Sequence, residues 1–276
     1  MKKLSIIILS YNVKKLLLDC LASIPKHPDW EIIVVDNASS DASLQAVKKH
    51  FPFVAAAQND KNLGFAAGNN VGIHRSQGKF ILLLNPDTIV YPKTLETVLK
   101  YMEEHPKVGA ATCRVELPDG TLDYSCHRRF PDPIGSLLHF IGLRRLSKYS
   151  STHVPNIVHE IDALTGAFAM IRRDAGEQTG WLDEDYHWNG EDIDFCYKLK
   201  ARGWKVIYVP SVKITHFKGS SVKATADGHR LWATNSTTAM FTFYRKHLAQ
   251  KHPFFVNWIV YLSIWILKIV RLLKNA

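Results

Sequence analysis

The chain has 276 residues, of which 46% are hydrophobic and 22% are charged. This composition is ordinary for a globular protein with a full core, arranged as one large α/β domain or two small ones. Lysine and arginine outnumber aspartate and glutamate by 35 to 25, which favours anionic partners such as nucleic acid, anionic lipid or nucleotide diphosphates. The four cysteines have no metal-ligand spacing, which favours reduced, buried thiols in a cytosolic or cytosol-facing protein.

Strands and helices alternate from the first residues onward. The apolar run at residues 4–9 is too short for a signal peptide and is typical of a buried first strand. Further strands are predicted at 30–35 and 54–58, and helices at 13–24 and 42–50. This alternation is typical of a parallel, doubly wound sheet. No Gly-x-Gly-x-x-Gly follows the first strand and no Walker lysine motif occurs, which argues against a dehydrogenase or a P-loop enzyme.

Polar residues follow the first two predicted strands. Ser10, Tyr11 and Asn12 form the loop after the first strand, and Asp36 ends the second. In dinucleotide folds an acidic residue at such a strand end bonds the nucleoside, although a polar turn with a helix cap also explains this position. Residues 62–73 are rich in glycine, alanine and asparagine, which fits either a phosphate cradle or tight packing of a helix on the sheet.

The stretch Asn85-Pro86-Asp87 follows a five-residue apolar run at 80–84, which predicts a strand buried on both faces. Pro86 ends this strand, because proline donates no hydrogen bond to a neighbouring strand. Asp87 is therefore expected at the carboxyl edge of the sheet, where open α/β folds bind their ligands. A carboxylate there can hold a divalent cation, and through it a diphosphate, although Asn-Pro-Asp is also a common turn.

The second half of the chain contains one irregular, basic segment. Residues 117–159 are rich in arginine, proline, glycine and serine, which is typical of a loop region over a binding site or of a solvated basic surface. The other predicted elements are helices at 95–104, from 191 and at 226–246, and strands at 108–115, 161–171 and 204–209. His216 follows the last of these strands; a lone histidine is more often structural than a ligand.

Residues 183–194 combine six carboxylates with aromatic side chains such as Trp188, an unusual mixture for a plain solvated face. The spacing of apolar residues becomes helical from Glu191, which places Glu191 and Asp192 in the first turn. The helix dipole stabilises an ionised carboxylate there, as a catalytic base requires. Helix capping also accounts for acidic residues at this position.

Taken together in this order, these motifs resemble family 2 glycosyltransferases of the GT-A fold, in particular a bacterial rhamnosyltransferase-like branch. The resemblance covers most of the chain, residues 4–221. It implies an α/β domain at 1–225, with a mixed, mostly parallel Rossmann-like sheet flanked by helices, a nucleotide-binding half at 1–115 and an acceptor-binding half at 116–225. The motifs that carry the resemblance are residues 5–12, 34–41, 62–69, 84–87, 165–167, 191–194 and 216–221.

The resemblance also implies a role for each motif. Asp192 would be the general base, Asp87 and His216 would bind Mg²⁺ or Mn²⁺ with the donor diphosphate, and Trp188 and Glu191 would contact the acceptor. The residues expected to bind the donor nucleotide are Ser10, Tyr11, Asn12, Asp36, Asn37, Asn62, Gly64, Asn69 and Asn85.

Two positions depart from the family pattern. Asn85 replaces the first aspartate of the Asp-x-Asp motif, which removes one anionic metal ligand and puts strict metal dependence in question. Lys198 stands where many members carry an arginine, so the charge is kept and the bidentate fork is lost.

The implied activity is transfer of a sugar from a nucleotide-diphosphate donor to a hydroxyl of a saccharide acceptor, in cell-surface polysaccharide synthesis. One base opposite the leaving group gives a single displacement with inversion. Resemblance to the branch suggests deoxythymidine-diphosphate-L-rhamnose as donor and a lipid-linked acceptor. The alternative is a non-catalytic sugar-nucleotide-binding or membrane-binding protein on the same fold. Nucleic acid is not expected as a partner, because no basic motif is interleaved with base-stacking aromatics.

The C-terminal segment, residues 226–276, is predicted to be helical and membrane-associating. Residues 254–267 carry no charge, and basic residues lie before and after them. A membrane span needs about 20 apolar residues, so we expect a helix lying on an anionic membrane surface, at the cytoplasmic face of a bacterial inner membrane. Trp258, Tyr261 and Trp265 are expected on its apolar side. Docking on the protein's own core, or on a second subunit in a homo-oligomer, is the alternative.

Overall fold

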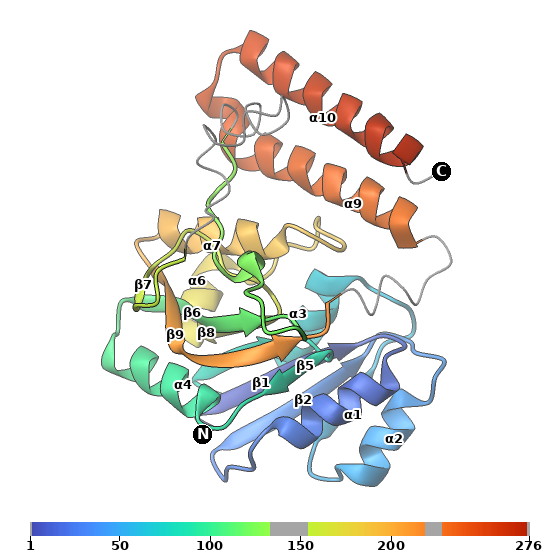
Figure 1. The fold of residues 1–276 in the computed structure, drawn as a ribbon, viewed down its shortest axis with the longest axis vertical. Helices are drawn as coiled ribbons and strands as arrows, with labels where there is room; N and C mark the ends of the chain where they lie inside the picture. Colours follow the sequence, from blue (N-terminus) through green and yellow to red (C-terminus); the bar gives the residue numbers. More distant parts are fainter. Residues whose placement is uncertain (1, 133–153, 219–227, 275–276) are drawn as a thin grey trace.

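The computed structural model describes residues 2–132, 154–218 and 228–274 (Figure 1). The strands are β1 Leu4–Ser10, β2 Trp30–Asp36, β3 Ala55–Gln58, β4 Phe80–Leu84, β5 Thr88–Val90, β6 Val108–Glu116, β7 His159–Glu160, β8 Phe168–Arg172 and β9 Lys205–His216. The longer helices are α1 Lys14–Ser23, α2 Ser43–His50, α3 Phe65–Arg75, α4 Thr94–Glu104, α6 Arg173–Thr179, α7 Glu191–Ala201, α9 Gly228–Phe243 and α10 Phe254–Lys274. Short helical turns are η1 Tyr124–Cys126, η2 Tyr244–Leu248 and η3 Ala249–Lys251.

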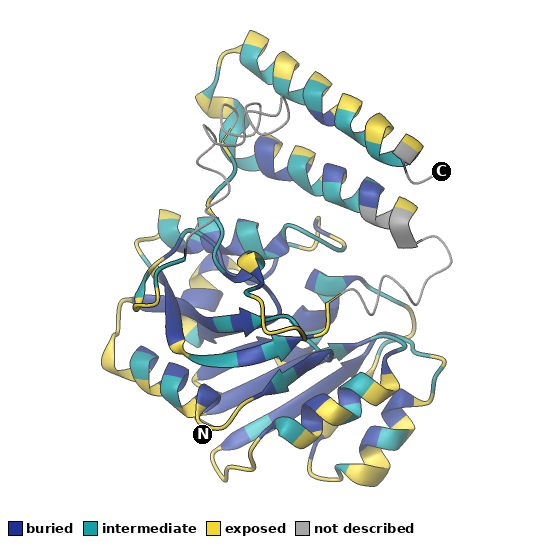
Figure 2. Ribbon diagram, viewed as in Figure 1, coloured by how far each residue is buried: buried dark blue, intermediate teal, exposed yellow. Residues whose placement is uncertain are grey.

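One mixed sheet forms the centre of the molecule. Its strands follow the order β3-β2-β1-β4-β8-β6-β9-β5, and β7 pairs with β9 off this path. The first four strands in this order are parallel, β8 runs antiparallel to both of its neighbours, and β6 and β9 are again parallel. The central strands are buried on both faces, as their continuous apolar sequences predict (Figure 2). The predicted mixed α/β sheet flanked by helices is therefore confirmed, and its described strand pairs are four parallel and four antiparallel.

The glycine-rich segment at 62–73 contains helix α3, which packs directly on β1 and β2. A Cβ atom built on Gly68 would lie 2.6 Å from a methyl carbon of Leu9, and one on Gly72 would lie 2.4 Å from a methyl carbon of Ile7. These distances leave no room for a side chain, so the glycines allow a close approach of helix and sheet. Of the two interpretations of this composition, the packing one accounts for these glycines.

Several predicted boundaries differ from the structure. The strand predicted at 161–171 begins only at Phe168, after a turn in which the Phe168 amide donates to the Thr165 carbonyl. The strand predicted at 204–209 continues to His216. Its pairing with β6 jumps from Cys113–Val209 to Arg114–Lys213, and this irregularity accommodates Pro210 within the strand. The short elements β5 and α6 were not predicted, because three to seven residues show too little periodicity.

Helices α9 and α10 lie side by side as a hairpin beyond α7, away from the sheet (Figure 1). The segments η2 and η3 connect them. Two polar residues of α10 contact the rest of the hairpin: Asn257 accepts a hydrogen bond from the Tyr244 hydroxyl, and Arg271 donates to Ser236. The apolar side of α10 is turned outward, including Trp258 and Trp265. Tyr261 instead packs against Phe241 in α9, contrary to the predicted side.

Candidate active site

A histidine and two carboxylates meet where β4 and β9 end. Strand β5 pairs with the end of β9 in a register that sets His216 opposite Thr88, next to Asp87. The Nε2 atom of His216 lies 3.3 Å from Oδ1 of Asp87, and both side chains are buried. On the other side of the imidazole ring, Nδ1 lies 3.5 Å from Oδ2 of Asp123. The predicted pair is therefore together, and the third residue, Asp123, was missed from the sequence.

These contacts determine the charge on the ring. Burial by itself lowers the pKa of His216, but its contacts with Asp123 and Asp87 outweigh burial and raise the pKa to about 9. Burial also works to raise the pKa of Asp123, yet the neighbouring His216 ring and hydrogen bonds from Ser125 and Lys218 hold it well below its ordinary value. The protonated ring thus balances two carboxylates when no metal is bound.

The donor set of this corner fits Mg²⁺ or Mn²⁺. It combines the carboxylate of Asp87 with the Nε2 atom of His216, and the Nδ2 atom of Asn85 lies 3.4 Å from Nε2. Oxygen ligands with one imidazole favour manganese. Among the described residues, no preformed group of three His, Cys, Asp or Glu ligands exists. A metal on Nε2 would leave Nδ1–H facing Asp123, the usual arrangement that orients a metal-bound histidine.

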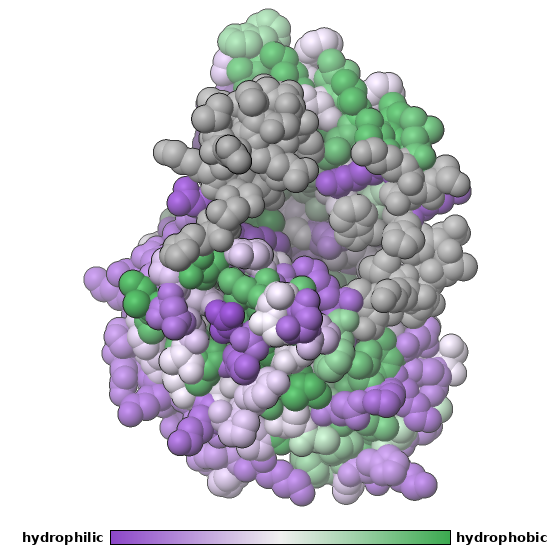
Figure 3. All heavy atoms as spheres, viewed as in Figure 1, coloured by the Kyte–Doolittle hydropathy of each residue, from purple (hydrophilic) through white to green (hydrophobic). Residues whose placement is uncertain are grey.

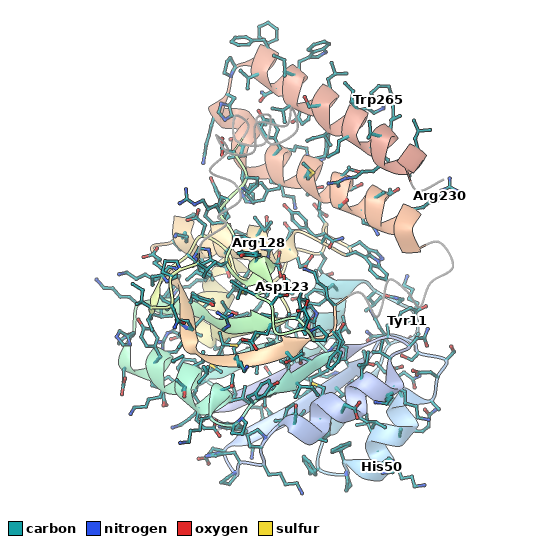
Figure 4. All side chains as sticks on the ribbon, viewed as in Figure 1. Tyr11, His50, Asp123, Arg128, Arg230 and Trp265 are labelled. Atoms are coloured by element: carbon teal, nitrogen blue, oxygen red, sulfur yellow. The ribbon has the colours of Figure 1, made fainter. Side chains whose placement is uncertain are left out.

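The loops after β1 and β2 form a second polar corner. The Asp36 side chain is almost fully buried, its Oδ2 accepts from the Ser39 amide at 3.0 Å, and its Oδ1 has no hydrogen-bond partner among the described residues. The Ser10 hydroxyl is likewise buried and unpartnered there. A buried, unpaired polar atom is costly, so both atoms suit a ligand that supplies the missing hydrogen bonds. Tyr11 lies half-exposed beside them (Figure 4).

The asparagines of this corner hold its loops together. Asn12 has a left-handed backbone, with φ 54°, and its Oδ1 accepts from the Ser40 amide at 2.8 Å. Asn37 donates to Asn62 at 2.8 Å and to the Gly64 carbonyl at 3.2 Å. Asn69 is buried inside α3 and donates to the Phe65 carbonyl at 2.9 Å. Asn12 and Asn37 thus connect the loops of this corner, whereas the Asn69 contact lies within α3.

The carboxylate of Asp192 lies in the first turn of α7. Its Oδ2 is 2.5 Å from Nη2 of Arg128 and accepts from the Gly166 amide at 3.2 Å. Arg128 is held at its side chain by Asp192 and at its backbone by Ala163, with which it forms an antiparallel bridge. The sequence had placed this arginine only in an irregular basic segment. Asp192 is thus a positioned carboxylate with an arginine partner, Arg128, which is labelled in Figure 4.

Two neighbouring side chains complete this end of the site. Glu191 is buried, and burial is the main reason that its pKa is raised to about 8. The negative charge of Asp192 is the second reason. A protonated Glu191 can donate a hydrogen bond where an ionised one could not. Trp188 lies half-buried in the loop before α7.

The short segment after Leu164 joins the corner formed by Asp87 and His216 to Asp192. The backbone amide of Asn85 donates to the Ala167 carbonyl at 3.1 Å, and the adjacent backbone amide of Gly166 donates to Asp192. A second link joins the nucleoside loops to the loop before α7, because the Phe65 amide donates to the His187 carbonyl at 2.7 Å. Gly64 has a left-handed backbone, with φ 82°, and a Cβ atom at this position would lie 2.4 Å from the His187 carbonyl oxygen. Both facts require glycine there. Backbone hydrogen bonds therefore connect the segments that carry Asp87, Asp192 and Gly64.

The sequence matches the family described as glycosyl transferase family 2 over residues 5–180. This chain belongs to that family. It is 30% identical to the rhamnosyltransferase WbbL of Escherichia coli K12 over 230 residues, which is 77% of this chain and 82% of WbbL. It is 26% identical over 238 residues to an N-acetylglucosaminyl-diphospho-decaprenol L-rhamnosyltransferase of Mycobacterium tuberculosis, covering 80% of this chain and 75% of that protein.

Solved glycosyltransferases share the fold. A mannosyltransferase from Pyrobaculum calidifontis, in complex with GDP-mannose and Mn²⁺, aligns with a TM-score of 0.61 at 20% identity, over 99% of this chain and 74% of that one. Residues 1–349 of TarS from S. aureus align with a TM-score of 0.57 at 19% identity, over 84% of this chain. The chain spans 65% of that TarS structure, less than two thirds of its length. At these identities the match establishes the GT-A-like fold.

Proposed function

We propose that this family 2 glycosyltransferase moves a sugar from a nucleotide-diphosphate donor to a saccharide hydroxyl, with inversion, in cell-surface polysaccharide synthesis. The observation that carries this proposal is the link between the two ends of the site. Asp87 and His216 form a cation-binding corner, and the Gly166–Ala167 backbone joins it to the carboxylate of Asp192. A binding module has no need for such a positioned base, which argues against the non-catalytic alternative.

The donor would bind across the carboxyl ends of β1, β2 and β4. The unpartnered buried oxygen atoms of Asp36 and Ser10 would contact the nucleoside, and Asn85, whose side-chain amide lies beside His216, would contact the diphosphate. Asp87 and His216 would hold Mg²⁺ or Mn²⁺, which neutralises charge on a diphosphate leaving group. Lys218, whose ammonium pairs with Asp123 at 2.9 Å, places a further positive charge next to this corner.

The acceptor would bind on the side of Trp188 and Glu191. The carboxylate of Asp192 accepts the proton of the attacking hydroxyl, and attack on the face opposite the diphosphate inverts the anomeric carbon. Arg128 and the Gly166 amide hold the carboxylate in place through Oδ2, while Oδ1 accepts from the Ile193 amide at 2.8 Å. We further propose the division into a nucleotide-binding half at 1–115 and an acceptor-binding half at 116–225.

Deoxythymidine-diphosphate-L-rhamnose is the proposed donor and a lipid-linked saccharide the proposed acceptor. Support comes from the names of two relatives, both rhamnosyltransferases, one of which is named for an N-acetylglucosaminyl-diphospho-decaprenol substrate.

The proposal is tested by a binding panel. Nucleoside diphosphates and their sugars, with thymine, uracil or guanine bases, are titrated with and without Mn²⁺, followed by thermal shift and calorimetry. We expect stabilisation by one nucleobase, strengthened by Mn²⁺, and loss of the Mn²⁺ effect in Asp87→Asn, because that variant removes the anionic metal ligand. The matched control is Asp19→Asn, an exposed carboxylate in α1 paired with Lys15. Binding that is indifferent to Mn²⁺ and to Asp87→Asn would contradict the metal site.

We also propose that α10 attaches the enzyme to the cytoplasmic face of the membrane. Among the described residues, one helix, Phe254–Leu273, is long and apolar enough to span a bilayer. Almost none of this helix is buried in the protein. Its outward side carries Phe254, Trp258, Trp265 and Leu273, each at least 60% exposed, and apolar side chains gather over this part of the surface (Figure 3). A patch of this kind on a surface marks an interaction site.

The hairpin favours a helix lying on the membrane over one that crosses it. Helix α10 packs lengthwise on α9, which carries threonines, serine and asparagine and the exposed Arg230. Crossing the bilayer would strip α10 from α9 or draw these polar groups into the hydrocarbon region. The basic side chains of Arg245 and Lys251 lie near the start of α10 and suit anionic headgroups.

A further inference from the structure

The first turn of α7, which carries Asp192, has no side-chain cap. Its N-cap residue is Gly190, with φ 92°, and glycine offers no oxygen to the free amides of the turn. The first backbone bond of the helix runs from the Asp194 amide to the Gly190 carbonyl at 2.9 Å. The orientation of the turn must therefore come from contacts with other parts of the protein.

Such contacts hold the turn from two sides. Asp192 faces Arg128 and Gly166 on the side of the sheet. Asp194 follows two positions later, about 200° further around the helix, and so faces the other way. Its carboxylate is fully buried and lies 2.6 Å from Nε2 of His247, with Lys198 at 3.1 Å and the Tyr186 hydroxyl at 3.2 Å. His247 is the partner that comes from outside α7 and its preceding loop.

His247 belongs to η2, the π-helical turn that ends α9. π-Helical turns are rare and often occur at functional sites. The His247 ring packs against Tyr197 of α7, with ring centroids 4.5 Å apart. The neighbouring Lys246 pairs with Asp183 at 2.5 Å and Asp185 at 2.7 Å in the loop before α7. The hairpin therefore contacts both the helix that carries Asp192 and the loop that leads into it.

We propose that His247 is a positioning residue for glycosyl transfer, which holds the Asp192 turn through Asp194. This inference rests on the proposed role of Asp192 as base. Without His247, the buried carboxylate of Asp194 loses its closest partner, and a buried charge that loses a partner drives local rearrangement. A small displacement of the turn moves the Asp192 carboxylate away from the acceptor hydroxyl. The C-terminal hairpin is accordingly part of the catalytic apparatus as well as the proposed membrane attachment.

The test compares His247→Ala, His247→Gln and the matched control His252→Ala in the full chain. His252 lies in the same hairpin, where its ring stacks on Tyr244 with centroids 6.3 Å apart. We expect His247→Ala to lower kcat by about tenfold to a hundredfold, because small misplacement of a catalytic group has effects of this size. Donor affinity stays unchanged. His247→Gln, whose amide can donate to Asp194, regains part of the rate, and His252→Ala resembles wild type.

Hydrogen exchange of the amides at 192–195 provides a readout that needs no turnover. These amides should exchange faster in His247→Ala than in His252→Ala, with or without an acceptor. If His247→Ala does not fold, Asp194→Asn replaces it and should show the same fall in kcat and faster exchange. Unchanged exchange at 192–195, or a kcat above half that of wild type, overturns the inference. An active Asp192→Asn enzyme would instead overturn the base assignment, while exchange still reports on the contact.

Discussion

The two ends of the site are built in different ways. At the donor end, His216 and Asp87 meet because β5 and β9 pair in a defined register, and both side chains are buried by the sheet. At the acceptor end, Asp192 meets Arg128 through segments 64 residues apart that join by one isolated bridge and by loop contacts. The proposed donor end is a product of sheet geometry, whereas the proposed acceptor end is assembled from loops and contacts the C-terminal hairpin through Asp194 and His247.

This difference has a chemical counterpart. A nucleotide diphosphate presents the same groups in every donor, so a rigid sheet edge can hold it. Acceptors differ in shape, and binding residues that vary among related proteins are usually found on loops supported by a rigid scaffold. Changes at the donor end should therefore alter metal and nucleotide binding, and changes at the acceptor end should alter the rate of transfer.

The largest effect is expected at the acceptor end, from Asp192→Asn. The amide cannot accept the proton of the attacking hydroxyl, so kcat for transfer should fall about a hundredfold to ten-thousandfold. Donor affinity should stay within about twofold of wild type, because Asp192 contacts Arg128 and the Gly166 amide, away from the proposed donor-binding residues. Steady-state kinetics with a saccharide acceptor and calorimetry with the donor measure the two quantities.

The matched control for this variant is Asp185→Asn. Its carboxylate lies in the loop before α7, is 61% exposed and pairs with Lys246. This control should keep nearly full activity, since the Asp185 carboxylate is largely solvated and Lys246 keeps its second partner, Asp183. An Asp192→Asn enzyme that retained more than half of wild-type turnover would show that another group is the base.

A smaller effect is expected at the donor end, from Asp123→Asn. The substitution removes the carboxylate charge that faces Nδ1 of His216. That charge attracts a divalent ion on Nε2 more strongly than the single proton that the ion replaces, so Mn²⁺ affinity should fall about tenfold to a hundredfold. Titration of Mn²⁺ in the presence of a nucleoside diphosphate measures it. Asp119→Asn, an exposed residue of the same segment bonded to Thr121, is the control, and equal affinities in both variants would contradict the role of Asp123.

The sequence predicts the donor end better than the acceptor end. Periodicity and strand-end signals locate the central strands, the Asn85-Pro86-Asp87 turn and the start of α7, because each depends on neighbours within a few residues. Asp123, Arg128 and His247 carry no local signal. Their partners His216, Asp192 and Asp194 lie 93, 64 and 53 residues away in the chain, and long-range contacts of this kind follow from the fold. Four buried, free cysteines were also predicted from composition and are confirmed.

The smallest effect on chemistry is expected from changing the outer side of α10. The double variant Trp258→Glu and Trp265→Glu places charges on residues that are 66% and 60% exposed. Trp265 lies on the side of α10 turned away from α9 (Figure 4). Because both sites are exposed, folding and transfer to a soluble acceptor should change by no more than about 0.5 kcal/mol. Binding to the membrane should be lost, because each carboxylate would have to leave water for the interface.

Flotation with anionic liposomes separates these outcomes. Wild type should float and the double variant should remain in solution, with transfer to a lipid-linked acceptor reduced and transfer to a soluble one preserved. Ile157→Glu is the matched control, since Ile157 is 66% exposed and far along the chain from the hairpin, and it should float like wild type. A double variant that still floats, or a wild type that never does, would contradict membrane binding through the apolar side of α10 and indicate that this side binds a protein partner. Loss of transfer to both acceptors would show instead that this side of α10 supports the Asp192 turn through the hairpin.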